Sequence, residues 1–217
     1  MVAIPLPPPI RPVDPVRVVI AAGERLVRIY DPTRHQMTSL TFRRYGPLAR
    51  FDHHHAGSDG LPAEDSERGV YYAAWSTPMS DAVASCFVEV FGDRGVVVPG
   101  DYCAAIPLVT RDLVPLDLRQ SGAMRSGTVA AIAKCDHRLS QPWSRYFYDA
   151  SSTYGGLDGL LYLNVHNDGN ALMLYERAET ALSCDDEETV RLDHPELRPL
   201  LVRIMNDHML IEGRSGQ

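Results

Sequence analysis

The residues of this sequence best suited to chemistry are two arginines, a tyrosine and a glutamate. Arg28 and Arg50 can each place a fork of N–H donors on phosphate oxygens. Tyr71 can stack on a flat ring, and Glu89 can hold a ribose hydroxyl. A carboxylate can also balance the positive charge that develops as an N-glycosidic bond lengthens, because that cleavage has an oxocarbenium-like transition state. These residue types suit the binding and cleavage of a dinucleotide.

Glu89 falls in a predicted helix. Apolar residues recur at the spacing of one buried helical face, at Met79, Ala82, Val83, Cys86, Phe87 and Val90. Ser76 or Thr77 is expected to cap this helix, and Pro78 suits the first helical position. Glu89 lies on or beside the apolar stripe, where a carboxylate needs a partner or a wet cleft. The alternative is a glutamate at the edge of the stripe with its carboxylate in water.

Arg28 falls in a predicted first strand over residues 24–31. Val27 and Ile29 share one side of that strand, which faces the core. Arg28 and Tyr30 share the other side, as expected at the edge of a cleft. The alternative for this second side is simple exposure to solvent.

The rest of the chain predicts mixed strands with helices packed on them. Strands are expected at 94–98, 102–109, 113–118, 159–164 and 171–175, and helices at 124–134, 141–150 and from about residue 195. Turn-forming residues at 165–170 indicate that the last two strands form a hairpin. Without an internal repeat, this pattern predicts a single α+β domain over residues 17–217, with a mixed β-sheet core.

Two segments are expected to lie outside that framework. Residues 1–16 contain six prolines and predict an extended N-terminal arm, which could lie on a partner subunit or move freely. Residues 53–68 predict a long, mobile, solvated loop. The loop begins with three consecutive histidines, but adjacent histidines rarely converge on one ion, so no metal site is expected.

Composition narrows the class of protein. The 217 residues are 45% hydrophobic and carry a formal net charge of −7, with a pI of about 5.6. An acidic balance argues against a general binder of nucleic acid or anionic membranes. No apolar run approaches membrane-spanning length, no secretory signal is evident, and four widely spaced cysteines favour free thiols in a reducing cytoplasm. Phosphate-loop, nucleophile-elbow, zinc-helix and Rossmann motifs are absent.

The order of motifs resembles the RES domain, a family of toxins from bacterial toxin–antitoxin pairs. The similar stretches are Leu26-Val27-Arg28-Ile29-Tyr30, Arg50-Phe51, Gly69-Val70-Tyr71-Tyr72-Ala73, Val88-Glu89-Val90, Asp158-Gly159-Leu160-Leu161-Tyr162 and Ala171-Leu172-Met173-Leu174-Tyr175. Together they cover about residues 24 to 178.

The resemblance implies an ADP-ribosyltransferase-like fold that acts on NAD+. By position, Arg28 and Arg50 would grip NAD+, Tyr71 would flank the nicotinamide ribose, and Glu89 would be the catalytic acidic residue. We count Glu89, Arg50 and Tyr71 as catalytic candidates, with NAD+ as substrate and no metal. The family also implies an Xre-type helix-turn-helix antitoxin that blocks the cleft, and a homodimer.

Two positions depart from the family pattern. Asn164 stands where many members have serine, and its amide can still donate and accept hydrogen bonds. Ile29 follows the first arginine where some members have tyrosine, and Tyr30 can take that place on the face of Arg28. Asn164 and Tyr30 therefore join Arg28, Arg50 and Tyr71 as expected binding residues.

The expected activity is cleavage of the nicotinamide N-glycosidic bond by hydrolysis or phosphorolysis. Transfer of ADP-ribose to a protein target is the alternative within enzymes. If the protein is not an enzyme, the alternative is a non-catalytic protein that binds a nucleotide or a partner. The asparagine at position 164, in place of serine, is the feature that favours this alternative.

Overall fold

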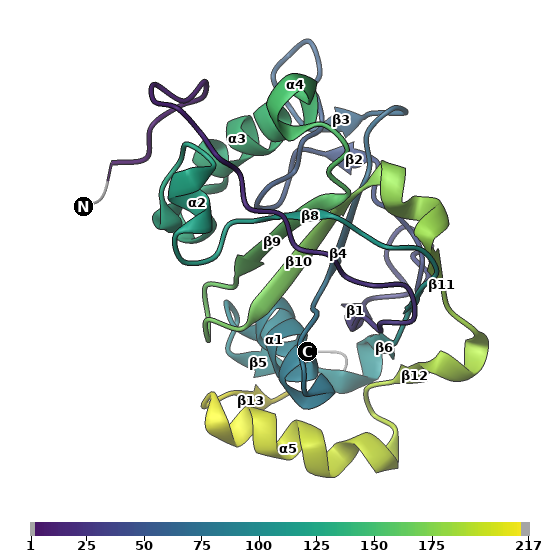
Figure 1. Cartoon of the computed structure of the whole chain (residues 1–217). Coiled ribbons are helices and arrows are strands. Elements are labelled where there is room, and N and C mark those ends of the chain that lie inside the picture. Colours follow the sequence, from purple (N-terminus) through teal and green to yellow (C-terminus); the bar gives the residue numbers. More distant parts are fainter. Residues whose placement is uncertain (1–2, 214–217) are drawn as a thin grey trace.

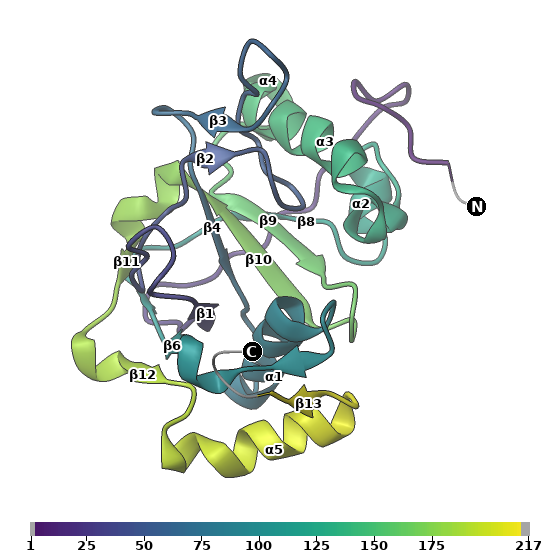
Figure 2. The same cartoon turned by 180° about the vertical axis from the view of Figure 1, so that it is seen from behind.

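A four-stranded sheet forms the centre of the computed structural model, which describes residues 3–213 (Figures 1 and 2). Its strands are β4 (Val70–Ala73), β8 (Pro115–Asp117), β9 (Gly159–Leu163) and β10 (Asn170–Tyr175). They are hydrogen-bonded in the order β4-β10-β9-β8. β10 is antiparallel to both β4 and β9, whereas β8 runs parallel to β9. The predicted mixed sheet and the hairpin over 159–175 are both confirmed.

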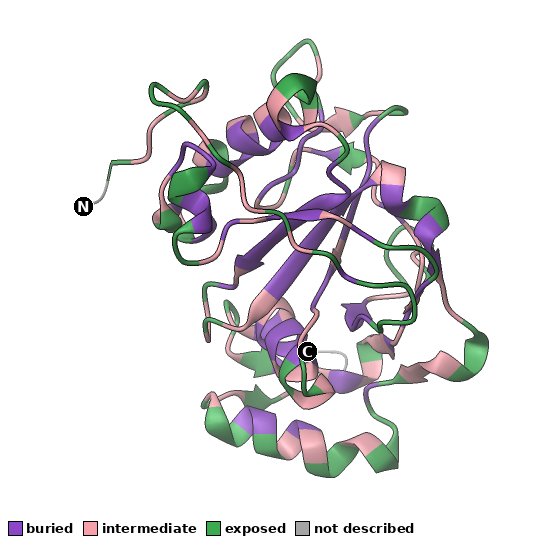
Figure 3. Ribbon diagram, in the orientation of Figure 1, coloured by how far each residue is buried: buried purple, intermediate pink, exposed green. Residues whose placement is uncertain are grey.

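Both faces of this sheet are buried, because successive side chains of a strand point to opposite sides. In β10, Ala171, Met173 and Tyr175 pack into one apolar cluster, and Leu172 and Leu174 pack into another. Figure 3 shows the buried colouring along β4, β8, β9 and β10. A sheet covered on both faces leaves the ends of its strands as the places where a ligand can enter.

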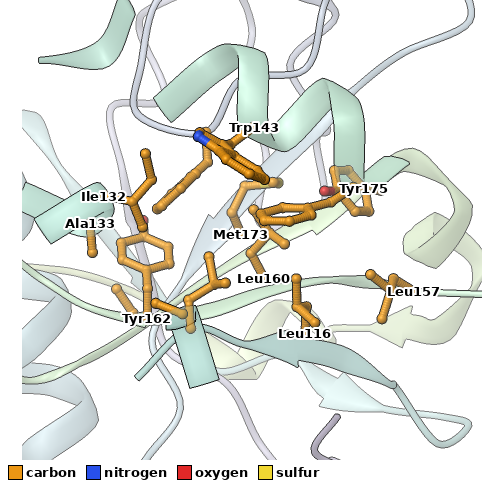
Figure 4. Close-up of a cluster of buried hydrophobic side chains, with 14 of the residues drawn as sticks. Leu116, Ile132, Ala133, Trp143, Leu157, Leu160, Tyr162, Met173 and Tyr175 are labelled. Atoms are coloured by element: carbon orange, nitrogen blue, oxygen red, sulfur yellow. The ribbon is translucent and has the colours of Figure 1, made fainter. Parts of the chain in front are cut away.

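Helix α3 (His137–Asp149) covers the face of the sheet to which Ala171, Met173 and Tyr175 point. Figure 4 shows Trp143 of this helix above Leu160 and Met173, with Tyr175 beside them. Asp136 caps the helix by accepting a hydrogen bond from the backbone N–H of Arg138. The predicted helix at 141–150 is therefore confirmed and begins one turn earlier.

Helix α1 (Met79–Phe91) packs against a second sheet of strands β1 (Arg28–Tyr30), β6 (Cys103–Ala105) and β12 (Thr189–Arg191). Its apolar side chains share a cluster with Val27 and Ile29, as the spacing in the sequence predicted. The predicted cap is wrong. Pro78 is the N-cap residue, and no side chain caps the helix.

The remaining elements are short. They are β2 (Tyr45–Gly46), β3 (Ala63–Glu64), β5 (Val96–Val97), β7 (Leu108–Val109), β11 (Leu182–Ser183), β13 (Ile211–Glu212), α2 (Gly122–Arg125), α4 (Ser151–Tyr154), α5 (Arg198–Asp207) and the 3-10 helices Pro99–Asp101, Ala130–Lys134, Glu176–Ala181, Asp186–Glu188 and Pro195–Leu197. α5 is the helix predicted from about residue 195, and it buries Leu201 and Ile204 in the same apolar cluster as the buried face of α1. The single helix predicted at 124–134 is wrong, because Gly127 adopts a positive φ of 87° and separates α2 from the next 3-10 helix.

The part of the N-terminal arm that the structure describes, residues 3–16, lies on its own domain; residues 1 and 2 are outside the described range. The carbonyl of Pro5 accepts a 2.6 Å hydrogen bond from Nε1 of Trp143, and Nη2 of Arg11 donates to the carbonyl of Thr128 at 2.9 Å. Gly127 permits this contact, because a Cβ there would lie 2.5 Å from the side chain of Pro9. Figure 1 shows the arm passing α2 before it crosses the central sheet.

The sequence predicted a solvated loop over residues 53–68. That prediction is wrong at both ends of the segment, where the side chains are buried. The side chains of His53 and His54 are completely buried, and Arg68 is 7% exposed. Nε2 of His53 lies 3.0 Å from Glu176, and Nε2 of His54 lies 3.0 Å from the carbonyl of Arg43. The histidine triplet therefore anchors the loop to the domain, and its exposed part is the hairpin around β3.

The described residues contain neither a membrane-spanning helix nor a group of metal ligands. Between residues 3 and 213, no helix has the length and apolar character needed to cross a bilayer. No group of three or more histidine, cysteine or acidic residues in that range is arranged to hold a metal ion. The four cysteines are unpaired.

Candidate active site

Two adjoining cavities lie where β1, β4 and α1 meet. The arginine cavity, of about 230 Å³, is lined by Arg28, Tyr30, Asp31, Arg34 and Tyr102, among others. The glutamate cavity, of about 50 Å³, is lined by Ser85, Cys86, Glu89 and Tyr162, among others. Ile29 and Tyr72 line both cavities. The two cavities thus share a wall, and we refer to the pair as the cleft, with an arginine part and a glutamate part.

Arg28 supplies a buried positive charge to this cleft. Its side chain is 4% exposed, and its Cζ lies 4.1 Å from the centre of the Tyr71 ring and 5.7 Å from that of Tyr30. Among residues 3–213 no carboxylate lies within salt-bridge distance of Arg28, and its Nη1 is buried without a hydrogen-bond partner. A buried cation without a counter-charge is costly, so this position favours an anion from outside the chain.

Glu89 supplies a negative charge at the other part of the cleft. It lies in the last turn of α1, half-buried, and its Oε2 is buried with no hydrogen-bond partner in the described part of the chain. Burial raises the pKa of Glu89, while the neighbouring His166 and Arg50 act against that rise. The carboxylate oxygen is therefore free to bind a ligand, because no hydrogen bond within the described part of the fold uses it.

Arg50 lies on a loop that Asp52 holds in place. Asp52 is completely buried and accepts hydrogen bonds from Nη2 of Arg43 at 2.7 Å and from the backbone N–H groups of Leu48 and Ala49 at 2.6 and 2.8 Å. The Arg50 guanidinium donates to the carbonyl of Cys135. Its charge still acts on Glu89, but Arg50 lines neither cavity.

Tyr71 lies beneath the cleft and lines neither cavity. It is completely buried, its hydroxyl donates a 2.8 Å hydrogen bond to the carbonyl of Ser39, and burial raises its pKa. Its ring face is taken by Arg28, which leaves no room for a stacked ligand. Tyr72, the next residue, lines both cavities and donates a 2.6 Å hydrogen bond to Asp52.

Tyr30 and Asn164 have different positions. Tyr30 lines the arginine cavity beside Arg28, on the face that the sequence predicted. Asn164 is completely buried and lines neither cavity. Its Nδ2 donates to Oγ of Ser85 at 2.8 Å, and its Oδ1 accepts from the backbone N–H groups of His166 and Asn167 at 2.9 Å.

The asparagine at position 164 therefore acts on the cleft through its neighbours. Ser85 lines the glutamate cavity one turn before Glu89, and His166 is the first of the positive groups that act on the Glu89 carboxylate. Sequence reasoning missed Tyr72, Ser85 and Tyr162 as cleft residues. The spacing of four between Ser85 and Glu89 was a usable signal, because such residues share a helix face.

The raised pKa of Glu89 predicts how stability depends on pH. A raised acid pKa means that the folded protein holds this proton more tightly than the unfolded chain does. Stability from Glu89 is therefore present at low pH and is lost as pH rises through the folded pKa. Urea unfolding of wild type and Glu89→Gln at about pH 4 and about pH 8 checks this, with the variant gaining relative stability at the higher pH. A constant difference at both pH values would contradict the prediction.

Fold and site together define a mixed α+β domain whose cleft offers a buried cation to one end of a ligand and a carboxylate to the other. The model of the RES domain matches residues 25–194, which is most of the chain. This chain belongs to the RES domain family, as the order of its motifs suggested.

A solved structure shows the same fold. The chain is similar to one in the crystal structure of the M. tuberculosis MbcT–MbcA toxin–antitoxin complex, with a TM-score of 0.55 and 17% sequence identity. The similarity covers 85% of this chain and 92% of that one. A comparison with curated protein sequences finds no match.

Proposed function

We propose that this RES domain protein is the toxin of a toxin–antitoxin pair and that it cleaves the nicotinamide N-glycosidic bond of NAD+. The observation that carries the proposal is the pair of unpartnered buried atoms, Nη1 of Arg28 and Oε2 of Glu89, on residues that line adjoining cavities. Other unpartnered buried atoms occur on His53, His54, Ser126 and Thr128, but those residues line neither cavity. Buried polar groups nearly always have partners, so two opposite charges without partners beside adjoining cavities favour a ligand that supplies both. The similarity to a toxin–antitoxin complex supports the biological role.

Arg28 would bind the pyrophosphate of NAD+. A guanidinium places two N–H donors on phosphate oxygens, and the buried position strengthens the attraction because little water screens it. Tyr71 would contribute by holding the Arg28 guanidinium in place from below, and Tyr30 by lining the same cavity. In this proposal Tyr71 supports the binding group rather than touching the nicotinamide ribose.

Glu89 would act on the bond that breaks. When the bond between C1′ and the nicotinamide nitrogen breaks, its electron pair moves to the nicotinamide ring. The ring leaves as neutral nicotinamide, and positive charge develops on the ribose. An ionised Glu89 carboxylate beside that ribose would accept a hydrogen bond from a ribose hydroxyl and stabilise the charge. Arg50 and His166 favour the ionised form of Glu89, and Asn164 would keep Ser85 and His166 in position.

The partner in this proposal is an Xre-type helix-turn-helix antitoxin that covers the cleft of a homodimeric toxin. Four unpaired cysteines suit a reducing cytoplasm as the compartment. The acceptor of ADP-ribose would be water or phosphate. In either case nicotinamide is released in step with the loss of NAD+, and no protein becomes labelled.

Incubation of the purified protein with NAD+ tests the function. Proton NMR or chromatography should show free nicotinamide accumulating over many turnovers, with ADP-ribose or its 1″-phosphate as the second product. NAD+ that stays intact during long incubation would overturn the enzymatic proposal. A protein carrying ADP-ribose, found by mass spectrometry with only stoichiometric NAD+ loss, would replace it with protein modification.

Removal of the Arg28 charge should separate binding from stability. We expect Arg28→Met to raise KM for NAD+ by about 100-fold with little change in kcat, since a lost charge-assisted hydrogen bond weakens ground state and transition state alike. The same change should leave the free energy of unfolding unchanged or higher, because a buried charge without a partner is removed.

Arg28→Lys is the matched control for that experiment. Lysine keeps the positive charge but lacks the paired N–H donors of the guanidinium. Its KM should therefore fall between those of wild type and Arg28→Met. Steady-state kinetics and urea unfolding provide the two measurements. A large loss of stability in Arg28→Met would show that the guanidinium serves the fold and not a ligand.

A further inference from the structure

A second carboxylate lines the cleft, and the catalytic proposal does not use it. Asp31 follows β1, lines the arginine cavity, and has a side chain that is 13% exposed. Its Oδ1 accepts hydrogen bonds from the backbone N–H of Thr33 at 2.9 Å and from the Thr33 hydroxyl at 2.6 Å. Its Oδ2 lies 3.0 Å from Nε of Arg34. The carboxylate is thus fixed in direction, which a ligand-selecting group requires.

Asp31 is also firmly ionised. Burial acts to raise its pKa, but the hydrogen bonds from Thr33 and the charge of Arg34 outweigh burial and hold the pKa below its ordinary value. Each carboxylate oxygen has a second lone pair, so Asp31 can accept further hydrogen bonds from a ligand while it keeps those from Thr33 and Arg34.

Asp31 lines the same cavity as Arg28, and that cavity adjoins the one that Glu89 lines. Ile29 and Tyr72 line both cavities. A dinucleotide with its first ribose at Glu89 and its pyrophosphate at Arg28 would extend its second ribose further into the arginine cavity. Asp31, just beyond the end of β1, is the carboxylate that lines that cavity.

We propose that Asp31 accepts hydrogen bonds from the hydroxyls of the second ribose and thereby selects dinucleotides with a free 2′-hydroxyl over those with a 2′-phosphate. The inference rests on the proposed function, because Glu89 and Arg28 set which end of the ligand reaches Asp31. An ionised carboxylate favours a hydroxyl, which donates to it, and repels a phosphate dianion. NAD+ is then the preferred substrate, and NADP+ is rejected.

Arg34 has a defined part in this selection. Its Nε faces Asp31, and its side chain is 60% exposed at the rim of the arginine cavity. The guanidinium lowers the repulsion that Asp31 exerts on a phosphate. The neighbouring residues Asp31 and Arg34 should therefore change selectivity in opposite directions, which a mere turn-forming role for Asp31 does not predict.

The test compares kcat/KM for NAD+ with kcat/KM for NADP+. Wild type should prefer NAD+, and Asp31→Asn should lower the ratio by about tenfold or more, because one change removes both an acceptor for the hydroxyl and a charge that repels phosphate. Arg34→Ala should raise the ratio. Thr33→Val is the matched control, since it removes the 2.6 Å hydroxyl contact to Asp31 without changing any charge. The Thr33 backbone N–H and Nε of Arg34 still hold the carboxylate in direction, so the ratio should stay near that of wild type.

Three results would overturn the inference: no preference in wild type, an unchanged ratio in Asp31→Asn, or an equal change in Thr33→Val. Calorimetric titration of NAD+ and NADP+ into the Glu89→Gln protein repeats the comparison without turnover. A tenfold preference in binding with no cleavage by wild type would count against the proposed reaction and leave the selection by Asp31 standing. Equal affinity for the two dinucleotides would reject the selection even if the enzyme is active.

Discussion

The Glu89→Gln protein should release nicotinamide from NAD+ about 10²- to 10⁴-fold more slowly than wild type, with a smaller change in KM. The amide has almost the shape of the carboxylate, but it carries no charge to stabilise the ribose as the glycosidic bond breaks. The geometry supports a specific loss, because Glu89 lines its cavity with an unpartnered oxygen. Nicotinamide release under saturating NAD+ is the measurement.

Two comparisons make that result interpretable. Far-ultraviolet circular dichroism should show Glu89→Gln to be as well folded as wild type, since no hydrogen bond to the buried Oε2 is lost. Glu187→Gln changes an exposed glutamate in the 3-10 helix Asp186–Glu188 and should keep full activity. Turnover by Glu89→Gln at the wild-type rate would remove Glu89 from the reaction.

The second large effect is expected from Asp52→Ala, which should lower the free energy of unfolding by about 3–5 kcal/mol. Asp52 is completely buried, forms a salt bridge with Arg43, and accepts further hydrogen bonds from two backbone N–H groups and from Tyr72. Its removal leaves the Arg43 charge without a counter-charge and those donors without an acceptor. Urea unfolding followed by fluorescence gives the difference.

Activity should fall with stability in Asp52→Ala, because Asp52 holds the loop that carries Arg50 and the ring that lines both cavities. Asp59→Ala is the control. Asp59 is exposed in the same region and accepts one backbone hydrogen bond from Leu61, so its loss should cost about 1 kcal/mol or less. If the two variants were equally stable, the hydrogen bonds around Asp52 would not matter to the fold.

The helix of Glu89 and the closing hairpin could be predicted because each follows from local periodicity. The spacing from Met79 to Val90 gave α1, and turn formers between two apolar runs gave β9 and β10. Arg28 and Tyr30 could be placed on one side of β1 by the alternation of a strand. These inferences depend only on residues close together in the sequence.

The features that the sequence did not predict depend on contacts across the fold. His53 and His54 look like residues of a solvated loop, but Glu176 and the Arg43 carbonyl bind them from distant or buried positions. The choice between Tyr71 and Tyr72 as the cleft residue depends on which face of β4 the cavity adjoins. In the sequence, Asn164 resembles a ligand-binding residue. Only the structure shows that its amide N–H group already donates a hydrogen bond to Ser85.

The unpartnered charges of Arg28 and Glu89 also make this protein a convenient target for inhibitor discovery. A small molecule that carries an anion and a hydrogen-bond donor at the right separation binds the folded form alone and raises its melting temperature according to its concentration and affinity. Compound libraries could therefore be ranked by dye-based melting in multiwell plates, with no need for a substrate.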